Sequence, residues 1–330
     1  MRAYWIRSQG DRPIPELRET PTPEPTPGQV LVRVHAASLN RGELIVRHGI
    51  HAIPGKPAAD AKPGGAECAG EVARVGSDVK TVKPGDRVMG RCAGGFAEYA
   101  LMDAREAVLV PPRLSWEEAA AIPLVFMVVH DMLIAQGRLQ ANEWLLVTGV
   151  SSGVGVAAVQ VGKQLGARVI GTSGSAEKLE RLKALGLDVG IRTRGADFVD
   201  AVLEAAGGKG ADLIVNNVGG TVFEACMRAA AFQGRFATVG YVDGVMRSEI
   251  DIEALHTKRL HLFGVSNKLR DAAQRAETVR GFVADVLPAI ADGRIRPVID
   301  RVFPFAELPA AVAYMESGAH LGKIVVRVAG

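Results

Sequence analysis

The fold of the chain is decided by one stretch, Trp144-Leu-Leu-Val-Thr-Gly-Val-Ser-Ser-Gly-Val-Gly155. Four apolar residues before Thr148 predict a strand that is buried on both faces. The glycine-rich turn then leads into residues 156–161, which carry helical spacing. The first turn of a helix has unpaired N–H groups and the positive end of the helix dipole, so a phosphate can approach a turn that has no bulky side chains. We therefore expect the diphosphate of a dinucleotide at this turn.

The glycines fall at Gly149, Gly153 and Gly155, a spacing that departs from the general G-x-G-x-x-G pattern. Taken alone, the turn is explained equally well as a glycine-rich turn without function. Residues 166–175 supply a second apolar strand, which completes a βαβ unit of the expected length of roughly 30 residues. This context favours a dinucleotide-binding fold.

Strands and helices alternate through the middle of the chain. We expect strands near residues 144–148, 167–172, 188–192, 212–217, 235–240 and 260–264. Six such strands with helices between them predict an α/β fold with a doubly wound parallel sheet. The first 120 or so residues instead contain short strands and turns, so that part is expected to be mostly β. A chain of 330 residues suits two domains.

Several local signals define elements outside that repeat. The proline-rich residues 21–28 predict an extended crossing. Ser115 is the expected N-cap of a helix that begins at Trp116, and residues 126–136 predict a further helix. A helix over 306–316 and a strand over 323–328 have no partners in the repeat, so we expect them to return to the first domain.

The composition excludes several classes of protein. Three cysteines at positions 68, 92 and 226 have no C-x-x-C spacing, so no disulfide framework and no structural zinc lobe is expected. The net charge of +3 is scattered along the chain, which argues against a nucleic-acid partner. No apolar run reaches the roughly 18 residues that a membrane span needs, and the start does not look like a signal peptide. We expect a cytoplasmic protein with no membrane partner.

Six segments together resemble the medium-chain dehydrogenase/reductase superfamily, in particular its zinc-free quinone oxidoreductase branch. The segments are A-A-S-L-N at 36–40, G-A-E-C-A-G-E-V at 65–72, K-P-G-D-R-V at 83–88, G-G-F-A-E-Y at 94–99, the glycine turn at 149–155 and G-A-H-L-G-K-I-V-V at 318–326. The resemblance implies a GroES-like catalytic domain over 1–122 and 265–330 and a Rossmann dinucleotide-binding domain over 123–264. It also implies a homodimer joined through edge strands, for which the apolar run 260–265 is the candidate.

The resemblance also bears on metal binding. Zinc-dependent members of the superfamily place a histidine ligand in the G-x-E segment and a cysteine ligand near position 40. Here those positions hold Ala66 and Asn40. Zinc prefers a tetrahedral set of Cys, His or carboxylate ligands. We therefore expect no metal, with Glu67 left as a structural carboxylate.

The end of the second strand of the repeat favours NADPH as the cofactor. Residues 171–175 contain no Asp or Glu to accept ribose hydroxyls or to repel a 2′-phosphate. Lys178 lies in the first helical turn that follows, where a cation costs some tenths of a kcal/mol up to about 1 kcal/mol unless a phosphate binds there. The alternative is a solvated lysine beside Glu177. The resemblance implies Ser173 and Lys178 as phosphate contacts.

Other cofactor contacts are implied by the resemblance alone. Thr193 replaces a tyrosine that contacts adenosine in relatives, and Arg194 could supply that contact by stacking or by pairing with phosphate. Val128 replaces a threonine that touches nicotinamide in relatives. The remaining implied cofactor contacts are Asn40, Ser152, Gly153, Val154, Asn217, Gly240, Tyr241, Phe263, Val265 and Lys323.

Without a metal to polarise it, the hydride acceptor must be electron-poor from the start. A quinone or a C=C bond conjugated to a carbonyl meets this condition, and Asn40 is the expected donor to the developing oxygen charge. A turn asparagine bonded to its own backbone is an equally weighted alternative for Asn40. His48 and His51 could donate a proton, although histidines on a glycine- and proline-rich loop are more often simply solvated.

Two other functions stay open. The acceptor could be an enoyl thioester or a substituted acrylate, for which Arg47 and Lys56 offer cations. The chain could also be a non-catalytic NADPH-binding protein, a possibility that the loss of a polar contact at Val128 keeps open.

Overall fold

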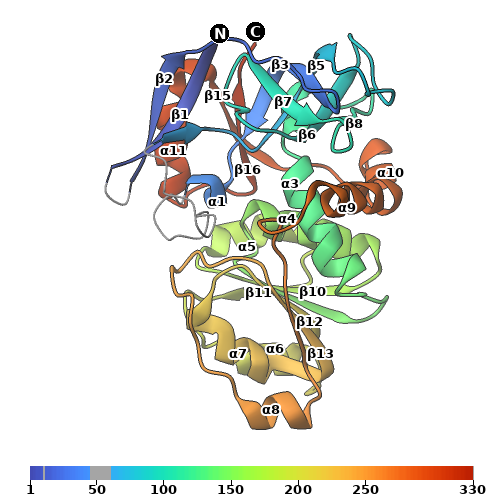
Figure 1. The fold of residues 1–330 in the computed structure, drawn as a ribbon. Coiled ribbons are helices and arrows are strands. Elements are labelled where there is room, and N and C mark those ends of the chain that lie inside the picture. The colour runs from blue at the N-terminus through green and yellow to red at the C-terminus, as the bar shows by residue number, and fades with distance from the viewer. Residues whose placement is uncertain (10–11, 45–60, 330) are drawn as a thin grey trace. The chain divides into compact units, whose positions relative to one another are not determined.

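The computed structural model describes residues 1–9, 12–44 and 61–329, which form two compact units (Figure 1). Unit 1 comprises Met1–Leu124, Arg270–Val283 and Arg296–Gly330, and unit 2 comprises Val125–Leu269 and Ala284–Ile295. The assignment of residues 1–122 and 265–330 to a catalytic domain and of 123–264 to a dinucleotide-binding domain stays a prediction.

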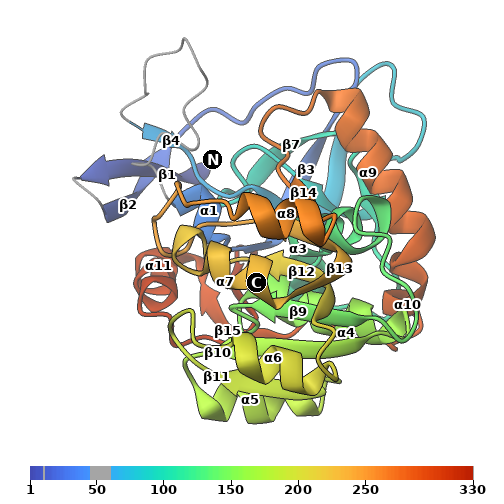
Figure 2. The same cartoon turned by 90° about the horizontal axis from the view of Figure 1, so that it is seen from below.

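Unit 2 is built on a six-stranded parallel sheet with the strand order β11-β10-β9-β12-β13-β14, which can be followed in Figure 2. The strands are β9 (Trp144–Thr148), β10 (Arg168–Ser173), β11 (Val189–Arg192), β12 (Ala211–Asn216), β13 (Ala230–Thr238) and β14 (His261–Gly264). The order changes direction between β9 and β12, which is the switch point where doubly wound sheets bind their ligands. The predicted doubly wound sheet is confirmed.

Helices cover both faces of this sheet, with α4 and α5 on one side and α6 and α7 on the other (Figure 1). The helices carried wholly or partly by unit 2 are α3 (Pro123–Val129), η1 (His130–Ala135), α4 (Gly153–Gln164), α5 (Ala176–Lys183), α6 (Val199–Ala205), η2 (Gly220–Val222), α7 (Phe223–Ala229), α8 (Ile252–Thr257) and α10 (Leu287–Ala291). The helix predicted over 126–136 starts earlier, at Pro123, because proline suits the first turn of a helix. It continues from His130 as a π-helix, which the sequence pattern does not reveal.

Unit 1 contains a mixed sheet in the order β15-β16-β3-β5-β6-β8, with β7 paired to β3, and a small sheet in the order β2-β1-β4. The strands are β1 (Arg2–Gln9), β2 (Arg12–Glu19), β3 (Gln29–Ser38), β4 (Ala61–Pro63), β5 (Glu67–Val75), β6 (Arg87–Arg91), β7 (Tyr99–Asp103), β8 (Val108–Leu109), β15 (Ile299–Pro304) and β16 (Lys323–Arg327). β16 pairs antiparallel with β3, with Val325 opposite Ser38. This confirms that the last strand returns to the first part of the chain.

The helices of unit 1 pack on the mixed sheet or extend from it. They are α1 (Arg41–Leu44), α2 (Trp116–Ala120), α9 (Ala272–Asp285, which ends in unit 2), η3 (Phe305–Glu307) and α11 (Leu308–Glu316). Ser115 caps α2 as predicted, in a capping box with Glu118. Leu308 and Val312 of α11 join the apolar core formed with β3, β5 and β16.

The three cysteines are free, as expected, and two of them are buried. Cys68 belongs to the core of unit 1 and Cys226 to that of unit 2. Burial raises the pKa of the Cys226 thiol, so this residue acts as a small core side chain. No helix of the described chain has the length and the apolar run that crossing a bilayer requires.

A buried carboxylate fastens α9 to unit 1. Glu106 accepts from Arg91 Nε and from Arg275 Nε, each at 2.8 Å, and is almost fully buried. Arg275 lies in α9, whereas Arg91 ends β6. The two arginines therefore compensate one buried charge and tie a late segment of the chain to an early one.

A stacked pair of rings joins α2 to β3. The rings of His35 and Trp116 lie 4.4 Å apart at 12°, and the Arg87 guanidinium lies 4.3 Å from the Trp116 ring centre. The Nε2 atom of His35 is buried without a hydrogen-bond partner among the described residues. Burial, helped by Arg33 and Arg87 against the opposing effect of Glu71 and Glu117, lowers the pKa of His35 below its ordinary value of 6.5.

The lowered pKa of His35 should therefore reduce the free energy of unfolding as the pH falls below about 6.5. The His35 imidazole binds a proton more tightly in the unfolded chain than in the folded chain. Neutral His35 therefore makes its full contribution to the free energy of unfolding above pH 6.5, and this contribution is lost as the pH falls. We expect the urea midpoint of His35→Phe, which keeps a ring against Trp116, to fall less between pH 7.5 and 5.5 than that of the wild type. Equal losses for the two proteins would contradict the assignment.

Candidate functional site

The glycine turn of unit 2 has the geometry of a phosphate site. Ser152 caps α4, and its Oγ accepts from the Gly155 N–H at 3.1 Å. Gly149 has a φ of 62°, and a Cβ on Gly155 would lie 2.5 Å from the carbonyl oxygen of Val150. Both positions therefore require glycine. The N–H groups of Gly153 and Val154 have no acceptor within the described part of the chain. The turn therefore offers backbone donors to an anion.

The end of β10 brings several predicted contacts together. The Ser173 Oγ accepts from the Ser175 N–H at 3.3 Å, and Lys178 lies in the first turn of α5. The side chain of Arg194 lies over Gly174, where a Cβ would come within 2.8 Å of Arg194 Cγ and Nε. Arg194 is exposed, and no described residue forms a hydrogen bond or ion pair with its guanidinium. Residues 171–175 at this strand end therefore carry hydroxyls and no carboxylate, and Lys178 and Arg194 lie in the segments that adjoin them.

Thr193 forms its hydrogen bonds with residues of its own turn and with the end of β10. Its N–H donates to the Ser173 carbonyl at 3.0 Å, which joins β11 to the end of β10. Its hydroxyl bonds to the Asp197 carboxylate and accepts from the Gly195 N–H at 2.9 Å. The Thr193 side chain is therefore engaged within its own turn, and its predicted contact with a cofactor stays a prediction.

The carboxyl ends of β9, β12 and β13 are tied together by hydrogen bonds. Asn217 donates from Nδ2 to the Thr148 carbonyl and from its backbone N–H to the Thr148 hydroxyl, each at 3.1 Å. The N–H groups of Val239 and Gly240 both donate to the Asn216 carbonyl, at 3.0 and 3.3 Å. Gly240 and Asn217, both predicted cofactor contacts, are thus neighbours.

The other residues predicted around nicotinamide are buried or half-buried. Tyr241 and Phe263 are half-buried, and Val265 is buried with its N–H bonded to the Thr238 carbonyl at 3.0 Å. Val128 is half-buried in α3. Asp243, which the sequence did not single out, accepts from the Thr221 N–H and hydroxyl at 2.9 and 2.6 Å and fixes the loop that follows Tyr241.

Unit 1 contains a buried cluster around Glu67. One carboxylate oxygen accepts from Ser38 Oγ at 2.5 Å, Asn40 Nδ2 at 2.8 Å and Lys323 Nζ at 2.9 Å. The other oxygen accepts from the Leu124 N–H at 2.7 Å. The side chain of Glu67 is 0% exposed and that of Lys323 is 5% exposed. The buried charges are therefore paired and hydrogen-bonded, as their burial requires.

Three neighbouring strands position this cluster. Glu67 begins β5, Ser38 ends β3 and Lys323 begins β16, and both β5 and β16 pair with β3. The Lys323 ammonium also donates to the Leu39 carbonyl at 2.9 Å and to Asn40 Oδ1 at 2.7 Å. All three of its donors are thus used within the protein. The predicted contact of Lys323 with the cofactor stays a prediction.

The residues at this position do not suit a zinc ion. A zinc site needs lone pairs from Cys, His or carboxylate groups, whereas Lys323 brings a cation to the carboxylate of this cluster. Within residues 1–9, 12–44 and 61–329, no group of three or more His, Cys, Asp or Glu side chains is placed to hold a metal. Arg47, His48, His51 and Lys56 lie outside the described residues.

The sequence carries a signal for the Glu67–Lys323 pair. Glu67 is followed by Cys-Ala-Gly and Lys323 by Ile-Val-Val, and a charged residue beside such a buried run is rarely buried without a partner. Two charges of opposite sign, each at the start of such a run, are therefore candidates for a pair. Ser38, which also bonds to Glu67, carried no such signal.

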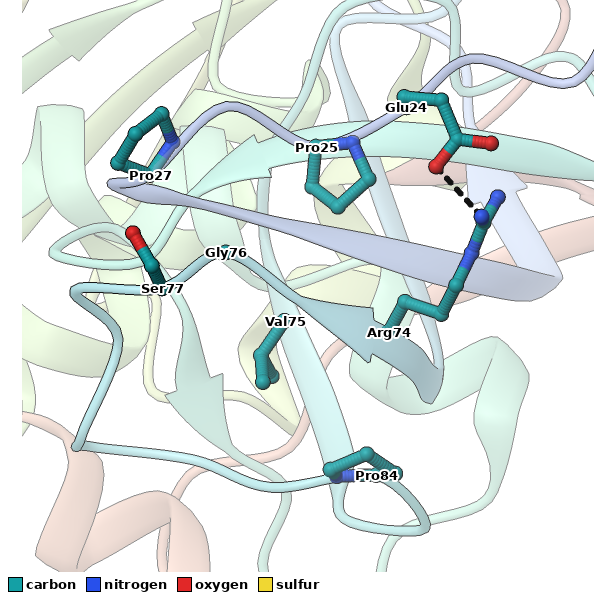
Figure 3. Close-up of a pocket in the computed structure, with 8 residues that line it drawn as sticks. All are labelled: Glu24, Pro25, Pro27, Arg74, Val75, Gly76, Ser77 and Pro84. Atoms are coloured by element: carbon teal, nitrogen blue, oxygen red, sulfur yellow. Dashed lines mark hydrogen bonds and ion pairs between the residues drawn. The ribbon is translucent and has the colours of Figure 1, made fainter.

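A surface hollow of unit 1 is separate from these groups. It measures about 550 Å³ and is lined by Glu24, Pro25, Pro27, Arg74, Val75, Gly76, Ser77 and Pro84 (Figure 3). The Glu24 carboxylate and the Arg74 guanidinium, the charged groups in its lining, pair with each other at 2.5 Å. The hollow contains none of the predicted site residues.

The strand order and the glycine turn of unit 2 define a dinucleotide-binding fold of the Rossmann type. Two family descriptions match the chain: "Alcohol dehydrogenase GroES-like domain" over residues 26–112 and "Zinc-binding dehydrogenase" over residues 153–279. They fall on unit 1 and, for most of its length, on unit 2. The chain belongs to the medium-chain dehydrogenase/reductase superfamily, with quinone oxidoreductases among its relatives.

Two kinds of curated protein resemble the chain. The quinone oxidoreductase of Rattus norvegicus is 29% identical and covers 99% of this chain and 97% of its own length. The spectinabilin polyketide synthase system protein NorB of Streptomyces orinoci is 32% identical over 98% of this chain. This chain spans only 14% of the length of that synthase.

Solved structures share the whole fold. The quinone oxidoreductase of Escherichia coli, complexed with NADPH, is 25% identical with a TM-score of 0.86, and the match covers 99% of this chain and 100% of that one. A structure described as an NAD-dependent alcohol dehydrogenase is 30% identical with a TM-score of 0.83, and the match covers 100% of both chains.

The Glu67 cluster predicts a large effect of a single substitution on stability. Lys323→Met leaves the Glu67 charge buried and unpaired, so the free energy of unfolding should fall by about 3–5 kcal/mol. The double variant E67Q/K323M, which removes both charges, should recover most of this loss. Urea unfolding followed by tryptophan fluorescence measures both changes.

Arg327→Met is the control on the same strand. Arg327 pairs with Glu117 at 2.7 Å but is 57% exposed, so its loss should change the free energy of unfolding by about 0–1 kcal/mol. If K323M and R327M lower the free energy of unfolding by the same amount, the Glu67–Lys323 pair does not have the stabilising role assigned to it.

Proposed function

We propose that this chain is an NADPH-dependent oxidoreductase that transfers hydride to a quinone or an α,β-unsaturated carbonyl without a catalytic metal ion. The observation that carries the proposal is the Lys323 ammonium bonded to Glu67 and to Asn40, one of the two positions where zinc-dependent relatives place a metal ligand. Because that donor set does not suit zinc, the acceptor must itself be electrophilic. The quinone oxidoreductase relatives support this choice of acceptor.

Each end of the cofactor has proposed contacts in unit 2. NADPH, when bound, supplies the hydride. The N–H groups of Gly153 and Val154 bind its diphosphate, with Ser152 fixing their direction. Ser173, Lys178 and Arg194 bind the 2′-phosphate, since no carboxylate at the end of β10 repels it. Asn217, Gly240, Tyr241, Phe263, Val265 and Val128 line the nicotinamide in this proposal.

The proposed donor to the acceptor is Asn40 in unit 1. Hydride transfer to a quinone or enone leaves negative charge on an oxygen, and a fixed N–H donor stabilises that charge without reorganisation. The Asn40 carboxamide is already held by Glu67 and Lys323.

A second candidate is the reduction of an enoyl thioester or a substituted acrylate. The polyketide synthases among the relatives support it, because such synthases build acyl chains and this chain matches one segment of them. The chemistry at the β-carbon is the same as for an enone, so the two candidates differ in what binds the remainder of the substrate. A third candidate is a non-catalytic NADPH-binding protein.

NADPH oxidation with a panel of acceptors separates these candidates. We expect turnover with a small quinone or an unsaturated ketone, no gain on adding Zn²⁺ and no loss after dialysis against a chelator. Faster turnover of a crotonyl thioester than of any quinone would favour the second candidate. Tight NADPH binding with no turnover of any acceptor would favour the third, and restoration of activity by zinc alone would overturn the metal-free proposal.

The preference for NADPH over NADH tests the proposed 2′-phosphate contacts at the end of β10. Arg194→Ala and Lys178→Ala should each raise the Kd for NADPH about tenfold or more while changing that for NADH little, because each removes a hydrogen bond to a charged group worth about 1.5–3 kcal/mol. Arg181→Ala, an equal charge change in the last turn of α5, is the control and should leave both constants unchanged. Fluorescence titration measures the constants, and a wild-type preference for NADH would contradict the assignment.

We also propose that two copies of the chain associate through β14. This strand is the last of the parallel sheet, and exposed apolar residues stand in the segments before it, among them Phe232 at 63% and Ile252 at 67% exposure. Sedimentation equilibrium should give twice the chain mass of 34.8 kDa. A mass of one chain at micromolar concentration would contradict the dimer.

A cytoplasmic location and the lack of a nucleic-acid partner stay predictions.

A further inference from the structure

Two adjacent asparagines stand where β12 ends in unit 2. Asn216 is the last residue of the strand and Asn217 follows it, beside the switch point of the parallel sheet. Asn216 is 0% exposed and Asn217 is 6% exposed. A buried carboxamide needs partners for both its N–H groups and its oxygen. The partners of these two amides therefore decide what this edge of the sheet offers to a ligand.

The amide of Asn216 is used within the protein. Its Oδ1 accepts from the N–H groups of Val218 and Gly219, each at 3.0 Å, and its Nδ2 donates to the Gly219 carbonyl at 2.9 Å. Turning the amide by half a turn would place its N–H groups against two backbone N–H groups, so only one orientation is satisfied. Asn216 therefore fixes the turn over residues 217–219.

The amide of Asn217 is oriented by Thr148, the last residue of β9. The Asn217 N–H donates to the Thr148 hydroxyl and Asn217 Nδ2 donates to the Thr148 carbonyl, each at 3.1 Å. The hydroxyl in turn lies 3.2 Å from Asn216 Oδ1, closer than its 3.4 Å to the Val215 carbonyl. A reversed Asn217 amide would place oxygen against the Thr148 carbonyl oxygen. The nitrogen of Asn217 is therefore fixed on β9.

The oxygen of the same amide is available to a ligand. No residue in the described part of the chain donates to Asn217 Oδ1, and this atom is not among the polar atoms sealed from solvent without a partner. It is an accessible acceptor on a residue that is otherwise buried. Such an atom at the switch point of a parallel sheet suits a ligand that donates a hydrogen bond.

We infer that Asn217 Oδ1 accepts a hydrogen bond from the nicotinamide half of NADPH, and that Thr148 and Asn216 are the positioning residues that hold it for this contact. The inference rests on the proposed function, in which Asn217 lines the nicotinamide. That half of the cofactor carries two kinds of donor, the N–H groups of its carboxamide and the hydroxyls of its ribose. Asn216 also fixes the neighbouring strand end, because its carbonyl accepts from the Gly240 N–H at 3.3 Å.

The first test removes the acceptor and keeps the size of the side chain. Asn217→Leu should raise the Kd for NADP⁺ about two- to tenfold, as expected for the loss of one neutral hydrogen bond. The Kd for 2′,5′-ADP, which lacks the nicotinamide and its ribose, should not change. Calorimetric titration measures both constants. An unchanged Kd for NADP⁺, or an equal rise for both ligands, would overturn the inference and leave the proposed reaction standing, since no turnover enters the measurement.

A cofactor analogue identifies the donor. The 3-acetylpyridine analogue of NADP⁺ has no carboxamide N–H. If the carboxamide is the donor, Asn217→Leu should leave the Kd of the analogue unchanged. If a ribose hydroxyl is the donor, the substitution should raise the Kd of the analogue and of NADP⁺ alike. Both results support Asn217 Oδ1 as an acceptor, whereas no change for either ligand contradicts it.

A double-mutant cycle tests the positioning role. Thr148→Val keeps the branched side chain and removes the hydroxyl between Asn216 and Asn217. It should raise the Kd for NADP⁺ in the wild type but not further in N217L. Thr257→Val is the control, because it removes a hydroxyl that bonds to the Glu253 carbonyl within α8, and it should leave the Kd unchanged. Independent, additive increases in T148V/N217L would contradict the positioning role.

A spectroscopic measurement uses the wild-type protein. The carbon-13 signal of the Asn217 side-chain carbonyl, identified by its loss in N217L or in Asn217→Ser, should shift when NADP⁺ is added and stay in place with 2′,5′-ADP. No shift with NADP⁺, or the same shift with both ligands, would overturn the inference. The expected shift in a protein that turns over no acceptor would support the inference and reject the proposed reaction.

Discussion

A carboxylate and an ammonium group share the interior of unit 1, and much of the local sequence follows from that constraint. Neither charge could be buried alone, because the loss of hydration costs several kcal/mol for each ion. The pair therefore needs the hydroxyl of Ser38, the carboxamide of Asn40 and two backbone groups to complete its hydrogen bonds. It also restricts strand register, since a slip of one residue in β16 would turn Lys323 to the other face of the sheet. The same cluster gives Asn40 its fixed orientation.

The sequence predicted the repeating part of the fold well and the side-chain partnerships poorly. The strand-turn-helix pattern from Trp144 onward is local, so hydrophobic periodicity and glycine spacing were sufficient to place the parallel sheet. The start of β13 was less accurate: the strand begins at Ala230 and not near 235, and its register with β12 shifts between Ala211 and Leu213. Such an irregularity leaves no trace in an apolar pattern. The contact between Lys323 and Glu67 spans 256 residues and arises only because β16 returns to β3.

The candidate site shows the same difference between local features, which the sequence predicts, and side-chain contacts, which it does not. Glycine spacing identified the turn at 149–155, because its geometry is set by the backbone of that segment. Arg194 over Gly174 depends on the pairing of β10 with β11, and the sequence could propose its side chain only as a substitute for a missing tyrosine. Asp243 was not found at all, although it holds the loop after Gly240 against Thr221. An aspartate in a turn is common, and only the fold shows which backbone groups it meets.

The division of the chain into units has a practical consequence for engineering. The chain leaves unit 1 after Leu124, returns at Arg270, enters unit 2 again at Ala284 and comes back at Arg296. A chimaera that transplants only the continuous piece from 125 to 269 into a relative would leave the end of α9 and the whole of α10 behind. Exchange of the nucleotide module between members of the superfamily therefore requires two grafts, one for each stretch. Where this chain is the recipient, Arg275 stays in unit 1 and keeps Glu106 neutralised.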